Sequence, residues 1–258
     1  MKVAMVQMRI IAGDVAGNRS RGLTMADEAA ANADVVVLPE IWTTGYALRQ
    51  VATLAEDENG PTLTGLRAIA ARRAATIVAG SLPLRRHGKV YNEAVAISPD
   101  GATVASYAKI HLFSMYGEER FFAGGDRRGL FTAAGMKAGL AVCYDLRFPE
   151  LFRALTAEGA QIIFLPSEWP AARIEPWLTL NRARAMENQV YMCAVNCVGE
   201  HRGGPFGGQS LLIGPGGEIV AAGEAGEAIV YGEADPAVVA DTRENMKVWQ
   251  DRRPETYL

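Results

Sequence analysis

Cys143 occupies the place in this sequence where a nucleophile is most expected. It closes the apolar run Gly139–Cys143 and is followed by the segment Tyr144–Pro149. This pattern predicts a strand, a sharp turn and the start of a helix, which together present a thiol at the edge of a sheet. The other cysteines, Cys193 and Cys197, lie in an apolar stretch and are expected to be free thiols in the core.

Two charged residues lie at the ends of other predicted strands. Glu40 follows the apolar run Val35–Leu38, and Lys109 follows Thr103–Tyr107. Taken alone, either residue could be a solvated surface charge. Because ligands gather at the carboxyl ends of strands in α/β sheets, we expect Glu40, Lys109 and Cys143 to meet there.

These three residues supply what cysteine chemistry requires. A nearby ammonium such as Lys109 favours the thiolate and can donate a hydrogen bond to a developing oxyanion. A carboxylate such as Glu40 can take the thiol proton and later activate water. The trio therefore predicts a hydrolase that acts through a covalent intermediate on Cys143.

The rest of the chain alternates between apolar strand patterns and amphipathic helical patterns. Helices are predicted up to about Ala33 with Asn18 as N-cap, over Leu63–Ala75 with Thr62 as N-cap, and over Pro149–Glu158 and Glu175–Gln189. The turns Ser98–Gly101 and Gly214–Gly217 predict hairpins. Strands are predicted at Val3–Met8, Val35–Leu38, Thr76–Gly80, Tyr91–Ile97, Thr103–Tyr107, Met136–Cys143, Ile162–Leu165 and Val190–Val195. The order indicates one α/β domain over residues 1–258 with a mixed sheet.

Composition and charge give no sign of a nucleic-acid partner, a membrane span, a cofactor or a metal. Of the 258 residues, 49% are hydrophobic and 21% charged, and the net charge of -3 gives no reason to expect a nucleic-acid partner. No apolar run is long enough to span a membrane, and the first residues read as a strand, so we expect a cytoplasmic protein with free thiols. No cofactor and no metal are expected, because the histidines lack metal-site spacing: His87, His111 and His201.

Three separated motifs resemble those of the nitrilase superfamily of carbon–nitrogen hydrolases. They are Leu38–Glu40, Tyr107–Leu112 and Cys143–Glu150. The resemblance implies an α/β fold, a four-layer α-β-β-α sandwich with two mixed β-sheets. It also implies that Glu40, Lys109 and Cys143 are base, oxyanion-stabilising lysine and nucleophile, that the substrate is a small amide, and that the protein is a homodimer or a higher homo-oligomer.

A second catalytic glutamate follows from the same resemblance. The family places it shortly before a Pro-Gly pair, where this chain has Gly124-Gly125. Glu118 aligns best with it, and Glu119 is the alternative. Such a carboxylate would hold the lysine in place, although either residue could be a surface charge.

The loop Ser167–Arg173 resembles that of the omega-amidase branch, which hydrolyses the ω-amide of keto acids such as 2-oxoglutaramate. Ala172 stands where that branch has a second proline. Arg173 is the candidate for gripping the substrate carboxylate bidentately, with a surface ion pair as the alternative. The other candidates for the substrate pocket are Tyr144, Trp169, Trp42 and Tyr46, of which the last two could equally be packing residues.

Several alternatives remain open from sequence. A nitrilase, an N-carbamoyl hydrolase or an aliphatic amidase would share the trio, and a non-catalytic binding module could keep the fold. A redox protein is disfavoured because there is no Cys-x-x-Cys pair. We expect His111 to be structural rather than the base, and Arg147 to tie the nucleophile turn to a carboxylate.

Overall fold

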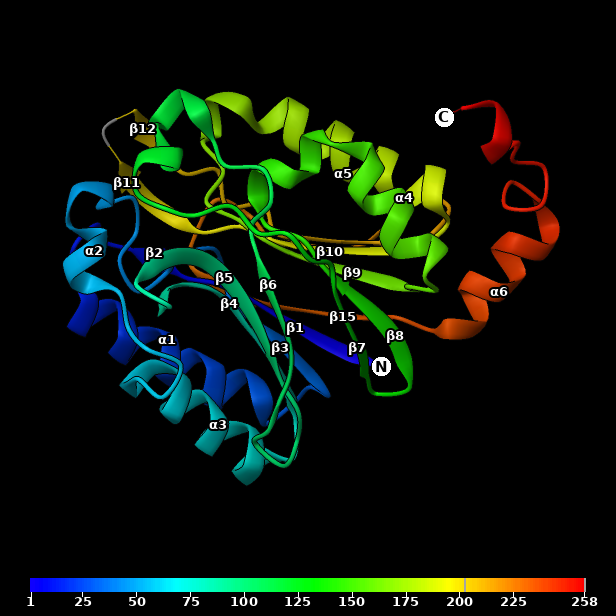
Figure 1. The fold of residues 1–258 in the computed structure, drawn as a ribbon. Helices are drawn as coiled ribbons and strands as arrows, with labels where there is room; N and C mark the ends of the chain where they lie inside the picture. The colour runs from blue at the N-terminus through cyan, green and yellow to red at the C-terminus, as the bar shows by residue number, and fades with distance from the viewer. Residues whose placement is uncertain (202, 258) are drawn as a thin grey trace.

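The computed structural model describes residues 1–201 and 203–257, and two six-stranded sheets form its centre (Figure 1). The first sheet has the order β15-β1-β3-β4-β5-β6. Its strands β1, β3 and β4 are parallel and the flanking pairs are antiparallel. Their bounds are Lys2–Gln7 (β1), Val35–Val37 (β3), Thr76–Arg86 (β4), Lys89–Ile97 (β5), Thr103–Ala108 (β6) and Ala228–Glu233 (β15).

The second sheet has the order β14-β13-β10-β9-β8-β7, again with a parallel centre of β8, β9 and β10 and antiparallel edges. Its strands are Gly129–Ala133 (β7), Met136–Leu140 (β8), Ile162–Pro166 (β9), Tyr191–Val195 (β10), Leu211–Ile213 (β13) and Ile219–Ala222 (β14). A small third sheet joins Gly204–Pro205 (β12), Val198–His201 (β11) and Arg9–Ile10 (β2).

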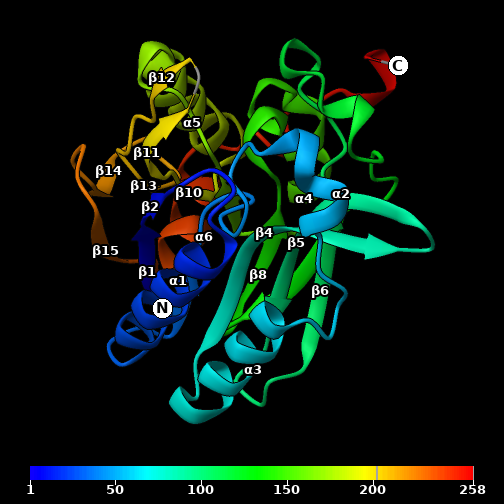
Figure 2. The same ribbon diagram turned by 90° about the vertical axis from the view of Figure 1, so that its left-hand side faces the viewer.

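Helices cover the outer face of each sheet (Figures 1 and 2). α1 (Val15–Ala30) and α3 (Pro61–Arg73) lie on the first sheet, and α4 (Pro149–Ala157) and α5 (Ile174–Asn188) lie on the second. The short α2 (Val51–Leu54) and the C-terminal α6 (Pro236–Asn245) complete the α-helices of the described residues. The layers run α-β-β-α with two mixed sheets, which confirms the expected sandwich.

Burial on both faces explains why the strands read as continuous apolar runs. Val35 and Val37 of β3 pack into the core shared with the second sheet, and Val36 and Leu38 pack into the core under α1 and α3. Because successive side chains of a strand point to opposite faces, both sets must be apolar.

Two of the predicted helices, α1 and α3, begin earlier than predicted. α1 is capped by Asp14, whose side chain accepts a hydrogen bond from the Gly17 N–H, and not by Asn18. Asn18 is buried and bonds Ile11 and Thr43 instead. α3 begins at Pro61, because proline fits the first helical turn, so Thr62 lies inside the helix.

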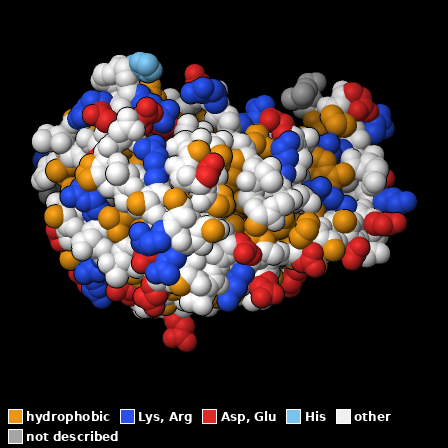
Figure 3. Space-filling view, turned by 90° about the horizontal axis from the view of Figure 1, so that it is seen from below, with side chains coloured by type: hydrophobic (Ala, Val, Ile, Leu, Met, Phe, Trp, Pro, Cys, Tyr) orange, Lys and Arg blue, Asp and Glu red, His pale blue; other side chains and the backbone are white. Residues whose placement is uncertain are grey.

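The surface shown in Figure 3 carries Lys and Arg side chains interspersed with Asp and Glu, around apolar side chains near its middle. Over residues 1–201 and 203–257, no helix has both the length and the apolar character needed to cross a bilayer.

Candidate active site

The ends of strands from both sheets meet at one buried cluster. Glu40 follows β3 and Lys109 follows β6 in the first sheet, and Cys143 follows β8 in the second. The Lys109 Nζ lies 2.8 Å from Glu40 Oε1, and both side chains are fully buried. The structure therefore brings the predicted base and lysine into direct contact beside the cysteine.

Glu40 is held by groups from three other parts of the chain. Its Oε1 accepts hydrogen bonds from Lys109 Nζ at 2.8 Å and from Asn92 Nδ2 at 2.8 Å. Its Oε2 accepts from the backbone N–H of Glu168 at 3.0 Å. These contacts fix the carboxylate across the junction of the two sheets. Sequence reasoning missed Asn92, because a polar residue inside a strand gives no sign of a site.

Of the two glutamates that sequence left open, Glu118 is the one in the cluster. Its carboxylate lies 2.9 Å from Lys109 Nζ and accepts from the Tyr46 hydroxyl at 2.9 Å and from the Phe113 N–H at 2.9 Å. Glu118 is fully buried, whereas the Glu119 side chain is 50% exposed. Lys109 is thus clamped between two carboxylates.

The nucleophile turn has the strained backbone expected of an elbow. The strand β8 ends at Leu140, and Cys143 opens a 3₁₀ turn, Cys143–Arg147, with φ of +45°. A non-glycine residue rarely adopts that angle, so the surroundings must hold it. The carboxylate of Asp145 accepts from the Val142 N–H at 2.8 Å and from the Tyr107 hydroxyl at 2.7 Å.

A second brace comes from α5. The Arg184 guanidinium donates two hydrogen bonds, at 3.1 and 2.9 Å, to the carbonyl of Leu146 in the turn. His111 lies on the other side, with its Nδ1 2.7 Å from Asp145 Oδ1 and its ring stacked on Phe148 at 3.7 Å. His111 therefore has the structural contacts expected of it.

The charged groups of the cluster shift the pKa of the Cys143 thiol in opposite directions. Burial raises the pKa of Cys143 well above its usual value, and the Glu40 carboxylate, which accepts a hydrogen bond from the thiol, raises it further. Lys109 acts in the other direction and lowers it. Burial by itself lowers the pKa of Lys109, but Glu40 and Glu118 raise it by more, so the lysine is a cation. The thiol therefore rests protonated beside its acceptor.

A narrow cavity of about 20 Å³ opens next to Cys143. Its lining includes Tyr144, Trp169, Arg147 and Arg173. Trp169 is pinned in place because its indole N–H donates to the Arg173 carbonyl at 2.7 Å. Of the predicted pocket residues, Tyr46 also lines this cavity.

The two arginines at the cavity lack ionic partners. None of the ion pairs in the described part of the chain includes either guanidinium. Arg147 lies 5.2 Å from the Trp169 ring. Arg173 lies 5.7 Å from the Phe113 ring, and its Nη2 lies 2.9 Å from Met115 Sδ. The expectation that Arg147 ties the turn to a carboxylate is wrong, because Asp145, the acidic residue of the turn, already bonds other groups.

Trp42 lies apart from the cavity. It is fully buried between the first sheet and α1, against Gly22, and its indole N–H donates to the Ala79 carbonyl at 2.8 Å. The backbone at Ile41 has φ of +29°, and the turn there directs the next side chain to the helix side of the sheet. Trp42 is therefore a packing residue.

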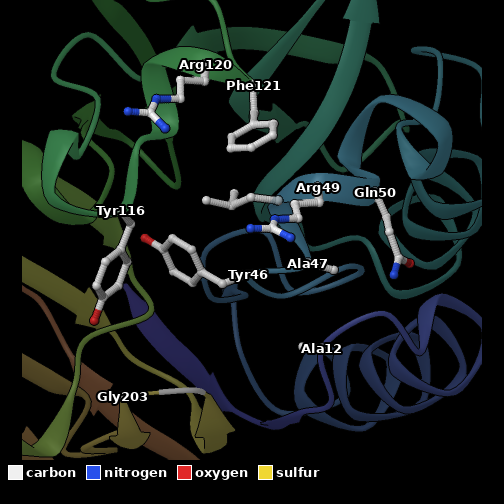
Figure 4. A pocket seen from close by; sticks show the side chains of 10 residues that line it. Ala12, Tyr46, Ala47, Arg49, Gln50, Tyr116, Arg120, Phe121 and Gly203 are labelled. Carbon is white, nitrogen blue, oxygen red and sulfur yellow. The ribbon is translucent and has the colours of Figure 1, made fainter.

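A larger hollow of about 550 Å³ adjoins the catalytic cavity (Figure 4). Tyr46 and Tyr116 line both spaces, and Arg49 and Arg120 line the larger one. Cys143 lines the narrow cavity and does not line the larger hollow. Among the residues that the structure describes, no three His, Cys, Asp or Glu side chains are grouped to hold a metal ion.

Known proteins resemble this chain over almost its whole length. The family model for carbon–nitrogen hydrolase matches residues 2–244. The chain is 36% identical over 255 residues to the 2-oxoglutaramate amidase of Bacillus subtilis (strain 168), which covers 99% of this chain and 98% of the relative.

Two solved structures extend the likeness to the fold. A CN-hydrolase superfamily protein from Xanthomonas campestris has a TM-score of 0.91 at 33% identity, covering 98% of this chain and 97% of that one. A mutant amidase from Nesterenkonia sp. AN1, with the acetamide moiety of fluoroacetamide covalently added at its active-site cysteine, has a TM-score of 0.86 at 27% identity, covering 100% and 97%.

The chain therefore belongs to the carbon–nitrogen hydrolase family, within the nitrilase superfamily. It is an enzyme of that family, and its relatives include the omega-amidase branch.

Proposed function

We propose that this enzyme hydrolyses the ω-amide of a short dicarboxylic keto acid, such as 2-oxoglutaramate, and releases ammonia. Cys143 is the nucleophile, Glu40 the base and Lys109 the oxyanion-stabilising residue, with Glu118 holding the lysine. The observation that carries the proposal is the buried contact of Lys109 with both Glu40 and Glu118 beside the Cys143 thiol.

The reaction runs in two halves. Glu40 takes the thiol proton as the sulfur attacks the amide carbon, and Lys109 donates to the oxyanion that forms. The tetrahedral intermediate expels ammonia, which receives the proton from Glu40, and a thioester remains on Cys143. Glu40 then removes a proton from water, and the resulting hydroxide attacks the thioester. The tetrahedral intermediate collapses to the carboxylic acid, and the departing thiolate takes the proton back from Glu40.

The choice of substrate rests on the charge of the cavity. Arg147 and Arg173 line it without an ionic partner in the described residues, so a substrate carboxylate would satisfy them. The 2-oxoglutaramate amidase of Bacillus subtilis, 36% identical, supports the same substrate class.

A substrate panel scored by ammonia release tests this function. The panel contains 2-oxoglutaramate, an N-carbamoyl amino acid, a neutral aliphatic amide and a nitrile. The proposal expects the ω-amide to give the highest kcat/KM and the thioester to appear as a mass adduct on Cys143. Cys143→Ala should abolish turnover, whereas Cys193→Ala, its buried control, should keep it. An adduct on Cys193 or Cys197 would sink the assignment of the nucleophile.

The substitution Arg173→Ala tests whether Arg173 binds the carboxylate of the substrate. Loss of a charge-assisted contact costs about 1.5–3 kcal/mol, so kcat/KM for the ω-amide should fall roughly 10–150-fold. A neutral amide of equal length should lose far less, and Arg173→Lys should restore little because it lacks the planar fork. If Arg147→Ala gives that pattern instead, Arg147 holds the carboxylate.

The proposal also includes a cytoplasmic homodimer or higher homo-oligomer, as the family resemblance and the free cysteines favour. Sedimentation at micromolar concentration should show a species larger than one chain. If only monomers are found, the proposed oligomeric state is wrong, and the proposed reaction is unaffected.

A further inference from the structure

Glu168 is a buried carboxyl group to which the proposed mechanism gives no role. It follows β9 and is 2% exposed, and neither of its carboxyl oxygens has a hydrogen-bond partner in the structure. Glu40 and Glu118, by contrast, have both oxygens bonded. A buried polar group without a partner is costly, so a native structure that keeps one calls for an explanation, such as a role in the site.

The surroundings of Glu168 favour its neutral form. Burial raises the pKa of Glu168 well above its usual value, and the negative charge of Glu40 raises it further, while Lys109 only partly offsets them. One ammonium already serves two carboxylates here, so a third carboxyl group has no cation left in the cluster. A neutral carboxyl group offers one O–H donor and a carbonyl acceptor.

Glu168 also occupies a defined place along the wall of the cavity. Its carbonyl oxygen lies 3.9 Å from the Cys143 Sγ, and the same loop continues through Trp169 and Pro170 to Arg173. All of these residues line the cavity. Within this lining Glu168 is buried and Arg173 is half-buried, so Arg173 lies nearer the surface.

We propose that Glu168 is a substrate-binding residue whose carboxyl O–H donates a hydrogen bond to an oxygen on the acyl chain, between the scissile amide and the carboxylate at Arg173. The inference rests on the proposed function and deepens it, because it makes Glu168 the group that selects a 2-oxo acid over the same chain without the oxo group. A charged carboxylate at this place would repel such a substrate, and a neutral one attracts its carbonyl.

The test compares 2-oxoglutaramate with glutaramate, which has the same length and carboxylate but no oxo group. The readout is the ratio of their kcat/KM values, measured by ammonia release for the wild type, Glu168→Gln and Glu168→Met. The wild type should favour the oxo substrate about tenfold, as one hydrogen bond of about 1.4 kcal/mol allows. Glu168→Gln keeps an N–H donor at the same place and should keep the ratio. Glu168→Met has no donor and should bring the ratio near one, mainly through KM.

The pH dependence of the ratio tests separately whether the Glu168 carboxyl group is neutral. Because a glutamine cannot ionise, Glu168→Gln and the wild type should have the same ratio from pH 6 to 9 if Glu168 is neutral there. If the wild-type ratio falls with rising pH while that of Glu168→Gln stays constant, Glu168 ionises in this range and is not held neutral. The charged and titratable groups that surround it are Glu40, Lys109, Glu118 and Cys143.

Each remaining outcome separates this inference from the function on which it rests. Equal kcat/KM of the wild type for the two substrates, or a ratio unchanged in Glu168→Met, overturns the role of Glu168 and leaves the ω-amidase function standing. Ammonia release from neutral amides but from neither ω-amide overturns the proposed substrate and this inference together.

Discussion

The Cys143 thiol lies between two charges of opposite sign, and this balance governs its reactivity. Burial and Glu40 raise the pKa of the thiol, while Lys109 lowers it. The proton therefore stays on sulfur, next to the Glu40 carboxylate. Such a site reacts with a bound amide without keeping a free thiolate exposed to oxidants.

Substitution of either charge should move the thiol pKa in a known direction. Glu40→Gln removes the negative charge, so the midpoint of iodoacetamide inactivation against pH should fall. Lys109→Met removes the positive charge, so the midpoint should rise. Turnover should drop in both variants, by at least about 10² for the loss of the base or of an oxyanion donor. Midpoints that moved in the same direction would contradict this account of the charges.

The two adjacent glutamates make a matched pair for testing how Lys109 is held. Glu118→Gln weakens the clamp on the ammonium and should reduce kcat by on the order of 10²-fold through misplacement of the lysine. Glu119→Gln changes a half-exposed side chain and should leave kcat and stability nearly unchanged. Steady-state kinetics decide between them, and a larger loss in Glu119→Gln would reverse the assignment.

At the scale of elements, the site depends on how closely neighbouring strands approach at their ends. Gly80 in β4 has φ of +66°, and a Cβ there would lie 2.0 Å from the carbonyl oxygen of Pro39, directly before Glu40. The peptide bond between Pro39 and Glu40 therefore packs directly against the backbone of Gly80, where no side chain fits.

Gly80→Ala should damage both stability and activity, and Gly88→Ala is its control. Gly88 also has a left-handed backbone, with φ of +76°, but a Cβ there meets no atom within 4 Å. Gly88→Ala should cost only the backbone strain, about 1–2 kcal/mol in urea unfolding. Gly80→Ala adds the clash with Pro39 and should cost more and lower kcat. Equal losses in stability with normal kcat would show that this approach does not position Glu40.

At the scale of the whole molecule, the interior holds all three cysteines as buried free thiols. Burial raises the pKa of Cys193 and of Cys197, as it does that of Cys143. A raised folded-state pKa means that the stabilisation is fully present below the unfolded thiol pKa, about 8.5, and is lost as pH rises above it. Each thiol that stays protonated in the folded state contributes a loss of about 1.4 kcal/mol per pH unit in that window.

The free energy of unfolding should therefore fall between about pH 8.5 and 10, as followed by urea denaturation. Cys193→Ala removes one titrating thiol and should flatten the slope by about 1.4 kcal/mol per pH unit. The cavity that the substitution leaves lowers the free energy of unfolding equally at every pH, so it does not change the slope. Val195→Ala leaves a comparable cavity in the same strand but keeps the thiol, so it should retain the wild-type slope. Identical slopes in all three proteins would exclude thiol ionisation as the cause.

Local sequence pattern was enough to predict several parts of this protein. Apolar runs that end in Glu40, Lys109 and Cys143 identified strand ends, and the turn after Cys143 identified the elbow. The three motifs predicted the family and, through the resemblance, the four-layer sandwich. The start of the first helix was not determined in this way: the sequence predicted Asn18 as N-cap, and the structure has Asp14 there.

Tertiary structure decided everything that depends on which face or which distant strand a side chain meets. Glu118 and Glu119 are neighbours in sequence, and only the direction of their turn buries one against Lys109 and exposes the other. Trp42 follows Glu40 closely but lies on the opposite side of the sheet. Glu168, at a strand end like Glu40, carried the same signal, yet its meaning depends on being the one carboxyl group of the cluster left without partners. Burial and pairing arise between strands far apart in the chain, so no local pattern encodes them.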